Sequence, residues 1–129
     1  MLTHRAECRA RTSQPPDFVD LTDDIQDAVT SSAITHGRVT VFAPDSSCAI
    51  LINERESGLL QDIKGAIARL SVRSDNGKAV VGSSSIVVPV VDGRVSLGTW
   101  QRVLLVELAA PSERNIAIQI VGETEDVSG

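Results

Sequence analysis

The hydrophobic residues of this chain alternate with polar ones over most of its length, and a period of two is typical of β-strands. The clearest strand segments are "RVTVFAP" (strand 38–43) and "CAILIN" (strand 48–53), followed by "SIVVPVV", "QRVLLVELA" and "NIAIQIVGE". A weaker strand is predicted over residues 2–12, ahead of two prolines that cannot donate to a ladder. The dipeptide Asp92-Gly93 predicts a two-residue hairpin turn, because both residues tolerate positive φ. Most strands are therefore expected to be antiparallel.

Two segments repeat their hydrophobic residues at helical spacing instead. The first, near residues 22–36, has Thr22 as a candidate N-cap, acidic residues in its first turn and a glycine just past its end. The second, near residues 54–70, follows Asn53, and its Leu and Ile side chains fall on one face. Strands in the majority with two helices in the first half of the chain predict an α+β fold.

Composition and charge argue against several classes of function. The 129 residues fit one domain, with a polar tail from about residue 123. A net charge of -5 argues against nucleic acid as a partner, and no apolar run has the length of a membrane span or a signal peptide. Cys8 and Cys48 stand apart, as expected for free thiols in a reducing cytoplasm. We expect a cytoplasmic protein.

Two sequence blocks are distinctive in combination: "VFAPDSSCAILINE" and, later in the chain, "DGRVSLGTWQ". With the segments around them, from Phe18 to about Val121, they resemble the YjbQ family, also described as secondary thiamine-phosphate synthases. The resemblance implies a partial β-sandwich with mostly antiparallel strands, assembled as a homotrimer. It also implies a cluster of histidines near the subunit interface that holds a metal or an anionic group, and a weak thiamine-phosphate synthase activity in some members.

The chain departs from the family pattern where that site is expected. Asp45, Ser46 and Ser47 stand in place of a histidine followed by two threonines. The interval from Ser71 to Gly82 is shorter than in the family and contains no histidine. Neither of the two histidines of the chain lies at a motif position, so the imidazole cluster is absent.

The candidate ligand-pocket residues are Asp45, Ser46, Ser47 and Glu54. The serine hydroxyls can bind an anion, but Asp45 should repel phosphate unless a metal or an arginine intervenes. Asp45 and Glu54 offer oxygen ligands to a divalent metal such as Mg²⁺, although turns and helix caps use the same residues, so no cofactor is expected. No general base is assignable, and the catalytic residues are therefore unknown.

Trp100 has two interpretations. It either stacks on a ligand or fills a core or a subunit interface, and packing is the favoured interpretation because tryptophan commonly buries a large apolar area.

Three functions remain open. The first is a divergent YjbQ-like protein that has lost the histidine-based metal or anion site and acts as an oligomeric binding or structural module, with a small-molecule ligand possible. The alternative is an active enzyme related to thiamine-phosphate synthase, with its site rebuilt around Asp45, Ser46, Ser47 and Glu54. The third is a partner-binding subunit that presents the acidic segment 17–27.

Overall fold

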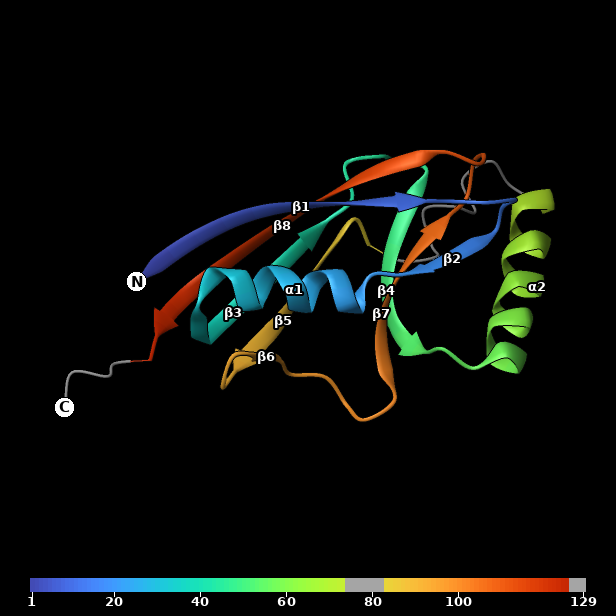
Figure 1. Cartoon of the computed structure of the whole chain (residues 1–129). Coiled ribbons are helices and arrows are strands. Elements are labelled where there is room, and N and C mark those ends of the chain that lie inside the picture. Colours follow the sequence, from blue (N-terminus) through green and yellow to red (C-terminus); the bar gives the residue numbers. More distant parts are fainter. Residues whose placement is uncertain (74–82, 126–129) are drawn as a thin grey trace.

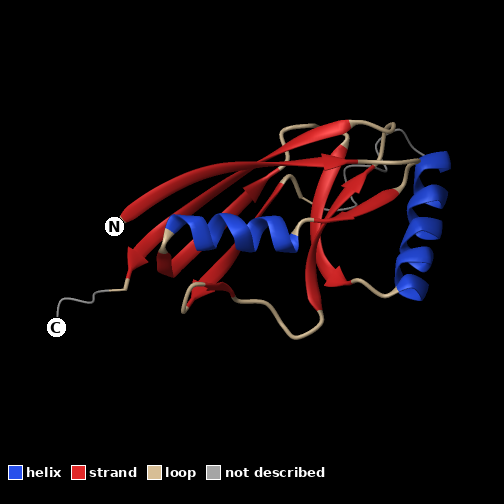
Figure 2. Cartoon of the chain, viewed as in Figure 1, coloured by secondary structure: helices blue, strands red, loops and turns tan. Residues whose placement is uncertain are grey.

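A computed structural model describes residues 1–73 and 83–125 (Figures 1 and 2). The chain forms two antiparallel sheets and two helices, an α+β fold as expected. The elements are β1 (Leu2–Arg11), β2 (Asp17–Asp20), α1 (Thr22–Ser32), β3 (Ile34–Phe42), β4 (Cys48–Glu54), α2 (Ser57–Arg73), β5 (Ser85–Val91), β6 (Arg94–Val95), β7 (Gln101–Glu107) and β8 (Glu113–Thr124).

The larger sheet has the strand order β1-β8-β3-β5-β6, and the smaller has the order β2-β7-β4. In Figure 1, α1 lies along the larger sheet, while α2 stands at the opposite end of the molecule from the two termini, beside β2, β4 and β7. Strand β8 pairs with β1 on one side and with β3 on the other, so the large sheet joins segments far apart in the sequence.

The main core lies between the two sheets and is sealed by α1. Alternate residues of β8 and β3 point into it, including Ile116, Ile118 and Val41, and α1 adds Ile25 and Val29. A second, smaller cluster lies between α2 and the other face of the small sheet; its buried members are Ala49, Ile67, Val106 and Leu108.

Strand β7 is therefore covered on both faces. Val103 and Leu105 face the main core, whereas Val106 faces α2. This accounts for the continuous apolar run "VLLV", because a strand buried on both faces needs no alternation with polar residues.

The first predicted helix begins at Thr22, where its expected range began, but its N-cap and its end were wrong. Leu21, not Thr22, is the N-cap, and the Thr22 hydroxyl instead accepts a hydrogen bond from the Val103 amide at 2.8 Å. The helix stops at Ser32 because Ala33 adopts the left-handed conformation, with φ of 61°. The expected range 22–36 therefore ran three residues into β3.

The second predicted helix also begins later than expected. Residues Asn53 and Glu54 are the end of β4, paired with β7, and α2 starts at Ser57. The carboxylate of Glu56 accepts hydrogen bonds from the amides of Gly58 and Leu59, so it fulfils the capping role assigned to Asn53.

Other expectations were confirmed with smaller changes. Asp92 and Gly93 both have positive φ and form the tight turn between β5 and β6. Strand β8 runs to Thr124, so the polar tail begins later than residue 123. Strand β2 is not among the strands that the sequence pattern predicted. Residues 74–82, most of the interval from Ser71 to Gly82, lie outside the described residues.

Neither helix is long and apolar enough to cross a membrane within the part of the chain that the structure describes.

Gly37 lies inside β3, directly opposite Gly122 of β8, and not at a helix end as predicted. A Cβ atom on Gly37 would collide with the backbone of Val121, and one on Gly122 would collide with the carbonyl of His36. Since these obstacles are backbone atoms, they cannot move aside cheaply, and the close approach of β3 to β8 requires both glycines.

We predict that Gly37→Ala and Gly65→Ala have opposite effects on stability. Gly37→Ala should lower the free energy of unfolding by at least about 2 kcal/mol, because it overpacks the β3/β8 ladder. Gly65 lies in α2 with only the end of the Arg69 side chain nearby, so alanine there should add about 0.5–1 kcal/mol. Urea unfolding of both variants measures the difference, and a Gly37→Ala protein as stable as the parent would contradict it.

Candidate functional site

Three polar side chains lie at the core-facing ends of three strands. Glu107 follows Val103 and Leu105 on the core face of β7, and Arg114 precedes Ile116 on the core face of β8. Thr12 continues the inward-facing positions of β1. Because side chains alternate strictly along a strand, these residues are directed into the core by the register of their neighbours.

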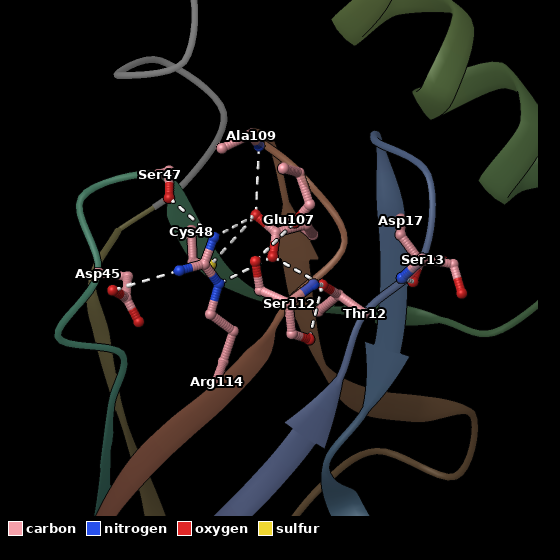
Figure 3. A network of polar contacts seen from close by, with 11 residues as sticks. Thr12, Ser13, Asp17, Asp45, Ser47, Cys48, Glu107, Ala109, Ser112 and Arg114 are labelled. Atoms are coloured by element: carbon pink, nitrogen blue, oxygen red, sulfur yellow. Dashed lines mark hydrogen bonds and ion pairs between the residues drawn. The ribbon is translucent and has the colours of Figure 1, made fainter.

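Glu107 is completely buried and is held by several donors (Figure 3). Arg114 donates to both carboxylate oxygens, from Nε at 2.8 Å and from Nη2 at 3.0 Å. The Thr12 hydroxyl donates at 2.7 Å, and the Ala109 amide donates at 3.2 Å. This bidentate geometry with additional donors is what a buried carboxylate needs to offset its desolvation.

The same guanidinium also holds the turn between β3 and β4. Its Nη2 donates to the Ser47 hydroxyl at 3.2 Å, and its Nη1 lies 3.3 Å from Asp45. Figure 3 shows Arg114 between Glu107 on one side and the 45–47 turn on the other. One arginine therefore connects the buried end of β7 to the turn that the sequence singled out.

These contacts keep the carboxyl group of Glu107 ionised at neutral pH. Burial alone would raise the pKa of this carboxyl, but the hydrogen bonds from Arg114 and Thr12 outweigh it and lower the pKa from 4.5 to about 2. The carboxylate therefore stabilises the fold above about pH 4.5, and this contribution is lost as the pH falls toward 2. The hydrogen bond to Glu107 likewise raises the pKa of Arg114.

Cys48 borders the network as an inert thiol. Its side chain is buried, with Sγ 3.7 Å from a Glu107 oxygen. Burial and the nearby Glu107 charge raise the pKa of Cys48 to about 11, and burial with Asp24 raises the pKa of Cys8 to about 11. Both thiols are free and protonated at neutral pH, which makes them poor nucleophiles.

The structure does not bring the four predicted pocket residues together within one chain. Asp45 and Ser47 contact Arg114, and Ser46 is exposed on the same turn. Glu54 lies at the opposite end of β4, six residues beyond Cys48, which corresponds to about 20 Å along the strand. Asp45 and Glu54 of one chain therefore cannot share a metal ion.

Among the described residues, no group of three or more His, Cys, Asp or Glu side chains is arranged to hold a metal. His4 lies on β1, and His36 lies on β3 with Nε2 3.6 Å from Asp92. Neither histidine contacts the Arg114 network.

A second polar cluster lies near Glu54, at the other end of the small sheet. Arg102 donates to Asp20 at 2.7 Å and to Asp23 at 3.2 Å, while Arg55 lies 3.8 Å from Asp20. Burial would raise the pKa of Asp20, but the hydrogen bond from Arg102 reverses this and lowers it. The acidic segment 17–27 is thus partly committed to ion pairs within the chain.

Trp100 borders this second cluster and is 74 % exposed, so it does not fill the core of this chain.

Sequence reasoning missed Glu107 and Arg114, although a signal was present. Extending the period of two from Val103 and Leu105 reaches Glu107, and extending it back from Ile116 reaches Arg114. Two opposite charges at predicted core positions, on consecutive strands, would have indicated a buried pair.

Comparisons with known proteins agree with this fold. The family model described as "UPF0047 protein YjbQ-like" matches residues 6–123. A UPF0047 protein of Methanothermobacter thermautotrophicus is 33 % identical, and the match covers 95 % of each chain. Another, from Archaeoglobus fulgidus, is also 33 % identical over 88 % of this chain and 98 % of the relative.

Solved structures are similar as well. A YbjQ-like protein of unknown function from Sulfolobus solfataricus superposes with a TM-score of 0.83 at 33 % identity, covering 95 % of this chain and 99 % of its own. A hypothetical protein from Aeropyrum pernix gives a TM-score of 0.83 at 30 % identity, with 95 % and 100 % covered. The chain belongs to the YjbQ/UPF0047 family, whose function is unknown.

We predict that Arg114→Met destabilises the protein by about 3–5 kcal/mol, because it leaves the Glu107 charge buried without its partner. The double variant Glu107→Gln/Arg114→Met should recover a large part of this loss, since glutamine keeps an acceptor for Thr12 and removes the charge. Urea unfolding midpoints of the two single variants and the double variant give the coupling.

The matched control is Arg11→Met, which breaks the exposed ion pair between Arg11 and Glu113 on the neighbouring strands. Its effect should stay below about 1 kcal/mol. The predicted contribution of the buried pair to stability is wrong if Arg114→Met costs no more than this control. It is also wrong if the double variant is no more stable than Arg114→Met.

Proposed function

We propose that this YjbQ/UPF0047 protein is an oligomeric binding or structural module that lacks the histidine-based chemistry implied by the family resemblance. The observation that carries the proposal is the contact of Arg114 with Asp45 and Ser47. The family resemblance implies a reactive histidine in this turn. In this chain two side chains of the turn, Asp45 and Ser47, instead contact the arginine of a buried ion pair.

The charges around this turn also favour the proposal. Asp45 was expected to repel phosphate unless a metal or an arginine lay beside it, and Arg114 does lie beside it. However, the Arg114 guanidinium already faces two carboxylates, Asp45 and the buried Glu107. An incoming phosphate would meet a site whose single positive charge is more than neutralised.

The alternative of a rebuilt enzyme finds less support. It needs Asp45, Ser46, Ser47 and Glu54 to act together, and within one chain Glu54 lies at the far end of β4. The thiol next to the turn is protonated, and no histidine reaches it in the described part of the chain. A nucleophile would therefore lack a base.

The proposed assembly is a homotrimer. Its support in the structure is the outer face of the large sheet, where Phe42, Val87 and Val91 are exposed on neighbouring strands. Beside them, the strand that pairs with the outer edge of β5 among the described residues is the two-residue β6. An exposed apolar face next to a nearly open sheet edge favours association. We place the protein in the cytoplasm, where two free thiols persist.

We expect purified protein to show no thiamine-phosphate synthase activity above background, and Asp45→Ala and Glu54→Ala to leave that background unchanged. The assay measures product formation with saturating substrates and added Mg²⁺, and circular dichroism confirms that each variant is folded. Substantial turnover in the parent that disappears in either variant would establish the rebuilt enzyme instead.

Light scattering at micromolar concentration should give three times the chain mass of 13.7 kDa. Val87→Asp should reduce that mass, because it puts a charge on the exposed apolar face. Gln61→Asp, an exposed position on α2, is the matched control and should keep the parent mass. A monomeric parent, or equal masses for the two variants, would contradict the proposed assembly.

A further inference from the structure

A cavity of about 460 Å³ lies between the end of β4 and the loop before β7. Its volume falls in the range of small-molecule sites. It lies at the opposite end of β4 from the 45–47 turn, so it is separate from the Arg114 network. The residues that line it are Glu54, Arg55, Glu56, Thr99, Trp100 and Arg102.

The backbone that carries Trp100 is held by a closed turn. The Gln101 amide donates to the carbonyl of Gly98 at 3.0 Å, and the Gly98 amide donates to Oε1 of Gln101 at 2.8 Å. These two bonds fix the backbone on either side of Trp100. A large aromatic side chain exposed beside a cavity offers a flat apolar surface to a ligand.

The charges around the cavity favour a positive ligand. Arg102 is already bonded to Asp20 and Asp23, and Arg55 lies within ion-pair distance of Asp20. Glu56 uses both carboxylate oxygens to accept amides of α2. Glu54 is exposed, and its carboxylate has no bonding partner among the residues described.

The geometry points to a binding site for a small organic cation, with the positive charge beside Glu54 and the apolar part against the indole of Trp100. Tryptophan is the aromatic side chain that attracts cations most strongly over its ring face. An anion would have to compete with Asp20 and Asp23 for Arg102 and would be repelled by Glu54. A neutral ligand would gain the aromatic contact alone.

This inference adds a class of ligand to the proposed binding module. It rests on that proposal in one respect: the cavity must stay open in the assembled protein. Trp100 is the single tryptophan of the chain, so its fluorescence reports on this site. The probes are benzyltrimethylammonium, benzyl alcohol and benzoate, which share an aromatic ring and differ in charge. Inorganic phosphate serves as a further anion.

We expect benzyltrimethylammonium to change the Trp100 emission in a saturable manner, with a dissociation constant of about a millimolar. Benzyl alcohol should bind more weakly, and benzoate and phosphate should produce no saturable change. Glu54→Gln should weaken binding of the cation about fivefold, because it removes an exposed charge, and should reduce the preference over benzyl alcohol. Glu123→Gln, an exposed glutamate on β8, is the matched control and should bind like the parent.

Trp100→Ala and Trp100→Phe are measured by ligand-observed NMR, since they lack the fluorophore. Alanine should abolish binding of the cation, and phenylalanine should retain part of it. Equal binding of the three aromatic probes, or an unchanged affinity in Glu54→Gln, would overturn the inference.

Assembly is measured separately, so the two proposals can fail independently. If the parent is a trimer whose Trp100 emission is that of a buried indole and no probe binds, a neighbouring subunit covers the cavity; the ligand site is then refuted while the assembly stands. If the cation binds to a monomer, the assembly is refuted and the ligand site stands.

Discussion

The buried pair between Glu107 and Arg114 is the interaction on which the ends of both sheets depend. A carboxylate with no exposed surface would be strongly unfavourable alone, and it is stable here because a bidentate guanidinium, a hydroxyl and an amide surround it. These donors come from β8, from the residue after β1 and from the loop after β7. The pair therefore fixes where three strands end relative to one another, and it connects the small sheet to the large one.

The 45–47 turn gains its conformation from the same pair. Asp45 lies beside Nη1 of Arg114, and Ser47 accepts a hydrogen bond from Nη2, the nitrogen that also donates to Glu107. A histidine at position 45 would bring no negative charge to that guanidinium, whereas aspartate matches it. In this chain, a position that the family resemblance associates with binding or chemistry takes part in a salt-bridge network.

The hydrophobic pattern predicted the strands well, because their period of two is set by burial on one face, as Ile116, Ile118 and Ile120 illustrate. Element ends were predicted less well, since they depend on contacts that are distant in sequence. Thr22 bonds to Val103 instead of capping its helix, and Gly37 serves the approach to Gly122 instead of ending a helix. For the candidate site, Asp45 and Glu54 are close in sequence, but within one chain the strand between them holds them apart. Trp100 does not pack in the core of this chain, because a local turn presents it at the surface, and its expected role at a subunit interface stays a prediction.

The sheet order also has a consequence for how the protein acquires its fold. Among the described strands of the large sheet β1 pairs with β8 alone, and the ion pair that joins their ends spans 102 residues of sequence. At a synthesis rate of about 5–20 residues per second, β8 is synthesised roughly 5–20 s after β1. During that time an unpaired strand and the core face of the large sheet are exposed on the nascent chain. The three arginines of β1 give the unpaired strand a positive charge. This charge disfavours pairing with another chain before β8 is synthesised.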